Sequence, residues 1–245
     1  MIILLTGCIN PNGMSFTTLS NIEERKRQYV NAIRFYLTST KHKIVFVENS
    51  GTNISSIFQD IDDSNRFEYI TFYGNQNKER GKGYGECEII EFALKNSKII
   101  TSSKDQLITK ITGRLILKNI NTMIFLHSIF HPQKTVCFSI NSDLSFPDSR
   151  FIIAPYSFFT EFLKTKEKIN DSYGYYFEHA LLETIKNLKD YAFTPFLFIP
   201  RIEGFSGTTS EQYHANRRSL IFNVKYAKYA IWQRKRFYKK YRNNE

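Results

Sequence analysis

The start of the chain decides the fold, with the stretch Ile2-Ile3-Leu4-Leu5-Thr6-Gly7. Four apolar residues followed by a small hydroxyl residue and a glycine are typical of a buried strand that ends in a turn. The stretch Ile44–Val47, which runs into Glu48-Asn49-Ser50-Gly51, has the same form. No basic region precedes Ile2, so we interpret the first run as a strand and not as a signal peptide.

Helices alternate with strands along the first part of the chain. Ile22–Leu37 has apolar residues at helical spacing and acids in its first turn, and a second helix is expected at about Glu86–Asn96. Two further strands are expected at Glu68–Tyr73 and near Leu107–Ile111. This alternation predicts right-handed crossovers and a parallel, doubly wound sheet.

The second part of the chain has a less regular order of elements. Strands are expected at Thr122–His127, Thr135–Ile140 and Arg150–Ala154, and helices at Ser157–Lys164 and Tyr175–Lys186. We therefore predict one α/β domain over residues 1–215, with a Rossmann-like mixed sheet flanked by helices. Residues 1–118 would form a nucleotide-binding half and residues 119–215 an acceptor half.

The composition excludes several classes of protein. The chain has 245 residues, of which 42% are apolar and 23% charged, and its mean hydropathy is −0.36. Such a chain is neither a polytopic membrane protein nor collagen-like nor wholly disordered, and no apolar run approaches the ~20 residues of a spanning helix. Three separated cysteines without a CxxC motif indicate a reducing compartment and argue against a structural zinc site.

The net charge of +11 is concentrated in the tail, residues 216–245. Residues 217–242 contain ten Lys or Arg and no acid, whereas residues 1–216 contain 24 basic and 22 acidic residues. A helical wheel separates a cationic side from an apolar side. The cationic side holds Lys225, Lys228, Lys235, Lys239 and Arg242, and the apolar side holds Tyr226, Ala227, Ala230, Ile231, Phe237, Tyr238 and Tyr241. This basic amphipathic helix would suit an anionic membrane surface, with packing on its own domain or RNA binding as alternatives.

Polar and glycine-rich segments follow the predicted parallel strands. Ligands of open α/β sheets bind beyond the carboxyl ends of the strands, which makes these segments candidates for donor binding. Ordinary turns favour the same residues, so a purely structural role is the alternative. The candidates at the first two strand ends are Thr6, Gly7, Glu48, Asn49 and Ser50.

Two cationic segments add candidates for phosphate binding. Arg80-Gly81-Lys82-Gly83-Tyr84-Gly85-Glu86 opens a helix, and the amides and cation of Gly81, Lys82 and Gly83 would suit a phosphate. The segment matches neither the dinucleotide motif nor the Walker motif. Lys110-Ile111-Thr112-Gly113-Arg114 ends a strand, and Lys110, Thr112 and Arg114 would suit a diphosphate. A surface ion pair is the alternative there.

Glu178 is the candidate base. It stands in Tyr175-Tyr176-Phe177-Glu178-His179, where aromatic neighbours would raise its pKa, and His179 is the second candidate. A carboxylate that merely favours the helix dipole is the alternative. The acceptor-binding candidates are Asp143, Arg150, Ser206 and His214. No metal-ligand set is predicted, because His127-x-x-x-His131 lacks the glutamate of a metalloprotease helix, and the G-x-S-x-G motif of hydrolases is absent.

Taken in order, these segments resemble the GT-A glycosyltransferases, and most closely the small bacterial capsule and O-antigen transferases. The resemblance covers residues 1–215 and rests on Thr6-Gly7, Glu48-Asn49-Ser50-Gly51, Gly81–Glu86, Lys110–Arg114 and Tyr176–His179. It implies a nucleotide-sugar donor across the first half of the sheet. Thr112-Gly113-Arg114 replaces the Asp-x-Asp that usually holds a divalent metal, so no cofactor is certain and a divalent metal stays open. Arg114 and Lys110 would instead neutralise the leaving diphosphate.

The function that the resemblance implies is transfer of a sugar from a nucleotide-sugar to a glycan hydroxyl, with Glu178 as the base of an inverting reaction. With the basic tail, it predicts a lipid-linked acceptor and a cytoplasmic protein, peripheral on the inner face of the cell membrane. A nucleic-acid-binding module that uses the tail is the alternative, although the near-neutral body disfavours nucleic acid as a partner. A nucleotidyltransferase is a weaker hypothesis, since few acid pairs exist to hold its metal.

Overall fold

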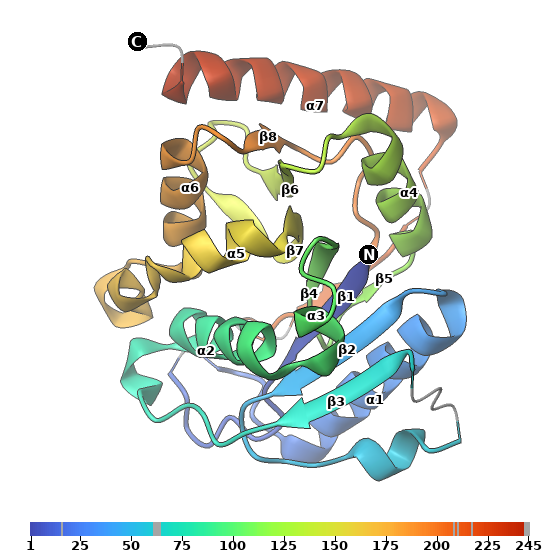
Figure 1. The fold of residues 1–245 in the computed structure, drawn as a ribbon, viewed down its shortest axis with the longest axis vertical. Coiled ribbons are helices and arrows are strands. Elements are labelled where there is room, and N and C mark those ends of the chain that lie inside the picture. Colours follow the sequence, from blue (N-terminus) through green and yellow to red (C-terminus); the bar gives the residue numbers. More distant parts are fainter. Residues whose placement is uncertain (16, 61–64, 208, 210, 217, 243–245) are drawn as a thin grey trace.

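A seven-stranded mixed sheet in the order β3-β2-β1-β4-β7-β6-β8 forms the centre of the computed structural model (Figure 1). The structure describes residues 1–15, 17–60, 65–207, 209, 211–216 and 218–242. The strands are β1 (Ile2–Gly7), β2 (Lys43–Glu48), β3 (Phe67–Thr71), β4 (Leu107–Thr112), β6 (Thr135–Ile140), β7 (Pro147–Pro155) and β8 (Ala192–Thr194). β3, β2, β1 and β4 are parallel, β7 is antiparallel to both of its neighbours, and β6 and β8 are parallel. The carboxyl ends of β1 and β4 therefore lie side by side, with Thr6 opposite Thr112.

Helices cover both faces of this sheet and bury one core on each. They are α1 (Ile22–Ser39), α2 (Lys82–Asn96), the short α3 (Lys98–Thr101), α4 (Ile120–Phe130), α5 (Tyr156–Leu163), α6 (Phe177–Asn187) and α7 (Leu220–Tyr241). Residues of α2, α5 and α6 pack on one face, and residues of α1 and α4 pack on the other. Single 3₁₀ turns lie at Ser55–Phe58, Lys78–Arg80, Lys166–Lys168 and Asp171–Tyr173. A small sheet in the order β10-β9-β5 joins Gln212–Tyr213, Ile202–Phe205 and Ile116–Leu117.

The fold class predicted from the sequence, a mixed sheet flanked by helices, is confirmed. The strands expected from the first two apolar runs are β1 and β2, and the later expected strands at Thr135–Ile140 and Arg150–Ala154 are β6 and part of β7. The helix expected at about Glu86 begins earlier, at Lys82, so the glycine-rich segment lies inside its first turn. The body of the chain thus follows its apolar periodicity closely.

The strand expected at Thr122–His127 is wrong, because these residues lie in α4. Isoleucine, threonine and phenylalanine fit strands by propensity, but packing decides which periodicity is used. The buried side chains of this segment are spaced as on one face of a helix, and they are Ile120, Met123, Ile124 and His127. The opposite face leaves Phe125, Ile129 and Phe130 exposed.

The tail helix α7 packs against the protein's own sheet, along its β8 edge (Figure 1). Phe237 is fully buried, with its ring centroid 4.4 Å from that of Phe193, and the hydroxyl of Tyr241 donates to the carbonyl of Leu144. On the apolar side expected to meet a membrane, Ala230 and Phe237 are therefore buried, and Ile231 is exposed. The other four residues of that side, Tyr226, Ala227, Tyr238 and Tyr241, are half-buried. Arg242, expected on the exposed cationic side, donates to backbone carbonyls of α6 and of the turn after it. Among the described helices, none combines the length and the apolar character needed to cross a membrane.

Candidate active site

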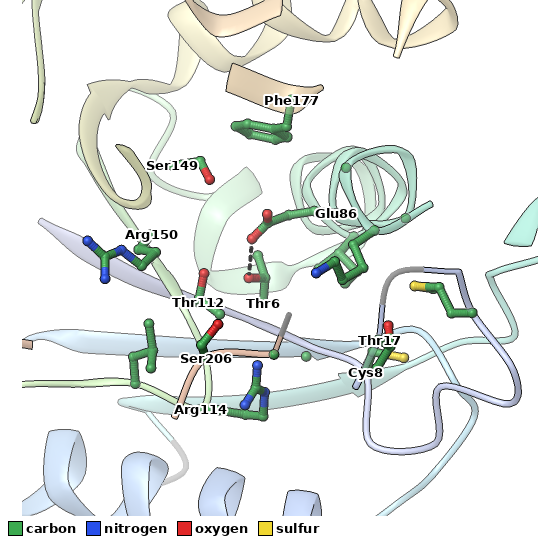
Figure 2. Close-up of a pocket in the computed structure, with 18 of the residues that line it drawn as sticks. Thr6, Cys8, Thr17, Glu86, Thr112, Arg114, Ser149, Arg150, Phe177 and Ser206 are labelled. Carbon is green, nitrogen blue, oxygen red and sulfur yellow. Dashed lines mark hydrogen bonds between the residues drawn. The ribbon is translucent and has the colours of Figure 1, made fainter. Parts of the chain in front are cut away.

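A cavity of about 460 Å³ opens at the carboxyl ends of β1 and β4, between the first turn of α2 and the first turn of α6 (Figure 2). This is where ligands of open α/β sheets bind. The cavity brings together most of the candidates from the sequence. Those that line it are Thr6, Gly7, Asn49, Lys82, Gly83, Thr112, Arg114, Arg150, Glu178 and Ser206.

Glu178 stands in the first turn of α6 and lines the cavity. Burial raises the pKa of its carboxyl group, and the nearby negative charge of Glu86 adds to the rise. The hydroxyl of Ser149, at the start of β7, donates to Glu178 Oε1 and fixes the direction of the carboxylate. A raised pKa makes this carboxylate a stronger proton acceptor than an exposed glutamate, which is what general-base catalysis requires.

Arg114 lies on another side of the cavity, near Ser206 (Figure 2). Its side chain is 7% exposed, and Nη1 donates to Gln28 Oε1 at 3.0 Å and to the carbonyl of Phe205 at 3.2 Å. Burial lowers the pKa of its guanidinium group. Because two neutral acceptors hold it and no carboxylate of the described residues is bonded to it, its positive charge remains available to a ligand in the cavity.

Lys110 does not face the cavity as the sequence argument expected. It lies in the middle of β4 with no exposed surface, and its ammonium group is 2.5 Å from Glu86 Oε1 and 2.6 Å from the carbonyl of Ser149. Glu86 also accepts a hydrogen bond from the hydroxyl of Thr6 at 2.9 Å. The lysine therefore compensates the charge of Glu86 beneath the cavity, and it is not placed to neutralise a diphosphate directly.

The glycine-rich start of α2 is shaped by Asp171 and not by an open anion site. A carboxylate oxygen of Asp171 accepts a hydrogen bond from the amide of Gly83 at 3.1 Å. Gly81 has a φ of 87°, and a Cβ placed there would lie 2.4 Å from Asp171 Oδ2. Because a carboxylate already occupies the end of this helix, the phosphate site expected at Gly81 and Gly83 is blocked at that amide. Burial raises the pKa of Asp171, which lines the cavity.

The residues at the end of β2 support the loops next to the cavity. Glu48 has no exposed surface and accepts hydrogen bonds from the amides of Ile9, Ser50 and Thr52 and from the hydroxyls of Ser50 and Thr71. Neither Glu48 nor Ser50 lines the cavity, whereas Asn49 does and is paired with Asn75 through two side-chain hydrogen bonds. Glu48 and Ser50 thus hold the loops that follow β1 and β2.

The acceptor-binding candidates fall into two groups. Arg150 and Ser206 line the cavity, and the guanidinium of Arg150 pairs with Asp148 and lies 4.6 Å from the ring centroid of Tyr213. Asp143 is exposed in a turn, where it accepts hydrogen bonds from Ser145. Exposed His214 also lies outside the cavity lining.

His179 acts at the start of α6 and does not line the cavity. Its Nδ1 accepts a hydrogen bond from the amide of Tyr176 at 3.1 Å, and its ring stacks on that of Tyr176. This is the geometry of a helix cap. The second catalytic candidate therefore orients the turn that carries Glu178, and it does not face the cavity itself.

Several lining residues were not proposed from the sequence. They are the charged residues Arg25, Glu86 and Asp171, the hydroxyl residue Ser149, and the aromatic residues Tyr29, Phe146, Tyr176, Phe177, Phe205 and Tyr213. Glu86 ends the candidate segment Arg80–Glu86, and Asp171 lies shortly before the candidate segment Tyr175–His179. Their acidic side chains next to these segments are the signal that could have identified them. Arg25 lies in α1 with a pattern common to solvated helix faces, yet it is 5% exposed and donates to the carbonyls of Cys8, Ile9 and Leu19.

Three carboxylates, Glu86, Asp171 and Glu178, could contribute to a metal or cofactor site in this cavity. Each already accepts a hydrogen bond or an ion pair from the protein, from Lys110, the Gly83 amide and Ser149 respectively. They come from α2, the 3₁₀ turn at Asp171–Tyr173 and α6, and so approach from different sides. The arrangement provides charge for a ligand without forming an Asp-x-Asp pair.

Comparison with known proteins gives a limited result. No protein-family model matches the chain, and no curated protein matches it. A cytidylyltransferase from Leptospira borgpetersenii is similar over 100% of this chain and 98% of its own, with 12% identity and a TM-score of 0.45. Mouse xyloside xylosyltransferase 1 is similar over 81% and 87% of the two chains (10% identity, TM-score 0.39), and HddC from Yersinia pseudotuberculosis over 80% and 89% (12%, 0.39). Likenesses this weak carry no argument about activity, so function has to be argued from the cavity.

Proposed function

We propose that this protein is a glycosyltransferase that moves a sugar from a nucleotide-sugar donor to an acceptor hydroxyl. The observation that carries the proposal is the pairing, in one cavity, of a carboxylate with a raised pKa and several cations. Glu178 lies on the side of β7 and α6, and Lys82, Arg114 and Arg150 contribute positive charge to the same lining. A base for a hydroxyl and positive charge for a leaving diphosphate are the two groups that this reaction needs.

The reaction is an in-line displacement at the anomeric carbon. Glu178 accepts the proton of the acceptor hydroxyl, and the oxygen attacks the anomeric carbon as the bond to the diphosphate oxygen breaks. The electron pair of that bond leaves with the nucleoside diphosphate, whose charge Arg114 stabilises. The aromatic side chains of Phe146, Tyr176 and Tyr213 at the cavity offer flat apolar surfaces of the kind that sugar rings pack on.

Nucleotidyl transfer is the second candidate, because the cavity holds more acid than the sequence argument assumed. Glu86, Asp171 and Glu178 all line it, and a metal-dependent reaction of a nucleoside triphosphate with a sugar phosphate would draw on such groups. The two reactions differ in their products, since glycosyl transfer releases a nucleoside diphosphate and nucleotidyl transfer releases pyrophosphate.

One assay separates these reactions. The purified chain is incubated with a panel of nucleotide-sugars, or with nucleoside triphosphates and sugar 1-phosphates, with Mn²⁺ or with EDTA. Thermal stabilisation identifies the donor class, and product analysis distinguishes the diphosphate from pyrophosphate. Release of nucleoside diphosphate that depends on an added glycan supports the proposal, and release of pyrophosphate alone contradicts it.

We further propose that the protein works at an anionic membrane, on a lipid-linked glycan of a bacterial surface polysaccharide such as a capsule or O-antigen. The surface that supports this differs from the face of α7 expected from the sequence, because Ile231 is the exposed member of that face and the others are buried or half-buried. It is formed by exposed apolar side chains of α4 and of residues 220–232 of α7, two helices that both lie in the upper part of Figure 1. These side chains are Phe125, Ile129, Phe130, Leu220, Ile221, Val224, Ile231 and Trp232.

Exposed lysines and arginines accompany this apolar surface along α7, which has no acid. Apolar side chains with basic neighbours suit the interface of an anionic bilayer. Co-sedimentation with vesicles tests this: the wild type is expected to bind vesicles with phosphatidylserine and not neutral vesicles. Ile221→Ser with Trp232→Ser should weaken binding, while Ile22→Ser, an exposed apolar residue of α1, should not. Equal binding by the two variants would contradict the proposed surface.

A further inference from the structure

A second, much smaller hollow lies between α4 and the sheet. It is lined by His127, His131 and Cys137 together with apolar residues, among them Met123 and Phe196. None of the three polar residues lines the cavity of the candidate active site. The proposed transfer reaction therefore makes no use of them.

The three side chains converge from two elements. His127 lies in the last turn of α4, His131 is the residue that caps the C-terminus of this helix, and Cys137 lies in β6. The rings of the two histidines are close, with their centroids 5.2 Å apart. The Nδ1 atom of His127 is 3.1 Å from the sulfur of Cys137, and one ligand atom from each residue lies within 4.8 Å of the other two. Zinc bonds of about 2.0–2.3 Å place ligand atoms roughly 3.5 Å apart in a tetrahedral site, so small side-chain shifts would close this cluster.

His127 supplies a separate observation. Its side chain is 2% exposed, and its Nε2 atom has no hydrogen-bond partner among the residues that the structure describes. Buried imidazole nitrogens are usually paired, and the contact on the other nitrogen is a thiol, which is a weak donor and a weak acceptor. A buried imidazole this poorly satisfied is better explained as a ligand than as an ordinary core residue.

We propose that His127, His131 and Cys137 bind a zinc-class cation, with the fourth position open to water in the small hollow. Two imidazoles and a thiolate are ligands that zinc prefers, and a metal would join α4 to β6. Both imidazole rings bind the cation in their neutral form.

The thiol must lose its proton when the metal binds. The metal displaces this proton to solvent, and the sulfur–metal bond replaces the sulfur–hydrogen bond. Arg234 of α7 is the neighbouring cation that acts on both Cys137 and His131. The positive charge of Arg234 stabilises the thiolate but repels a divalent cation. The negative charge of the thiolate is therefore needed to offset this repulsion.

The test uses the full chain, first treated with a chelator and then titrated with Zn²⁺ or Co²⁺. The expected result is a single ion per chain, a rise in the thermal midpoint with Zn²⁺, and a sulfur-to-cobalt charge-transfer band with Co²⁺. His131→Gln, at a partly exposed position, should reduce affinity by more than about tenfold, the lower bound for changes to outer-shell partners. Cys137→Ser should remove the charge-transfer band.

Matched controls keep the proposal open to refutation even if Cys137→Ser fails to fold. Cys87→Ser changes another fully buried thiol, and His42→Gln changes another partly buried histidine, so both should bind as the wild type does. Absence of stoichiometric binding by the wild type would overturn the proposal. So would equal affinity in His131→Gln, or loss of the charge-transfer band in Cys87→Ser. None of these readouts depends on transfer activity.

Discussion

Two glutamates near the same edge of the sheet have opposite surroundings. Glu48, at the end of β2, has no exposed surface and accepts hydrogen bonds from three amides and two hydroxyls. Glu178, at the start of α6, is held by the hydroxyl of Ser149 and borders the cavity. A carboxylate saturated by the protein's own donors has a structural role, whereas one with few donors and a raised pKa is available for chemistry.

The difference between Glu178 and Glu48 predicts its largest effect on the rate of transfer. Glu178→Gln removes the proton acceptor but keeps the shape of the side chain and an oxygen for Ser149. We expect donor affinity to be unchanged and transfer to fall by roughly 10²–10⁴-fold, the usual contribution of a general base. Donor binding is measured by calorimetry, and transfer by release of the nucleoside diphosphate.

Glu183→Gln is the matched control on the same helix, since Glu183 pairs with Lys168 away from the cavity lining. It should retain full transfer activity. Full activity in Glu178→Gln would instead place Glu178 with Glu48, among the structural carboxylates.

The next effect is on stability and concerns Glu48. Glu48→Gln replaces one carboxylate oxygen by an amide NH2 group, which is a donor, so backbone amides that now donate to that oxygen lose their acceptor. The free energy of unfolding should fall by about 3 kcal/mol, as expected when hydrogen bonds to a buried charged group are lost. Urea denaturation measures the change. Glu161→Gln, which breaks only the exposed pair with Lys164, should change stability by less than about 0.5 kcal/mol.

A third experiment tests whether Arg114 binds the ligand or has a structural role like that of Glu48. Arg114 donates hydrogen bonds to the neutral acceptors Gln28 and Phe205, yet it is nearly as buried as Glu48. Arg114→Met should weaken nucleoside diphosphate binding by about tenfold or more, the equivalent of one charged hydrogen bond. Arg34→Met, at an exposed pair with Asp60, is the control. Unchanged affinity in Arg114→Met, with lowered stability, would make Arg114 a structural residue like Glu48.

The smallest effect is the pH dependence of stability. The pKa of Glu178 is raised by burial above its ordinary value of 4.5, so between these two values the folded protein keeps a proton that the unfolded chain has lost. Wild-type stability therefore falls as pH rises through this window. Glu178→Gln lacks this loss and should be the more stable protein near pH 7, with the difference shrinking as pH falls to 4.5. Thermal midpoints of both proteins from pH 4 to 7.5 would show it, and a constant difference would contradict the raised pKa.

The fold could be predicted to a useful degree because apolar runs and glycines mark the parallel strands directly. β1, β2 and β6 were expected close to their observed positions, and the cavity does lie beyond the ends of β1 and β4. The error at Thr122–His127 arose because strand-favouring residues also fill one face of a short helix. Whether this segment forms a helix or a strand depends on its packing against the sheet. The strands of that sheet come from distant parts of the chain, so the local sequence does not reveal the outcome.

The site was harder to predict because charged residues and glycines look the same in the sequence whether they bind a ligand or only support the structure. Lys110 was expected to face a diphosphate, but its partner Glu86 lies on α2, and only the packing of α2 on the sheet brings them together. Gly81 and Gly83 suggested a phosphate site, but glycines are needed there for another reason. The carboxylate of Asp171, distant in the sequence, packs against both positions and leaves no room for a side chain. The cluster of His127 and His131 with Cys137 likewise joins a helix to a strand, so cysteine spacing along the chain could not reveal it.

The helix that presents Glu178 is secured at its far end by the tail. Arg242 donates to the carbonyl of Ile185, 57 positions earlier in the chain, and to that of Leu188 just beyond α6. A cation at this end also opposes the partial negative charge of the helix terminus. Truncation before α7 would therefore remove the hydrogen bonds that hold the far end of α6, the helix that carries the proposed base. The shortened enzyme would be slower although every residue that lines the cavity is unchanged.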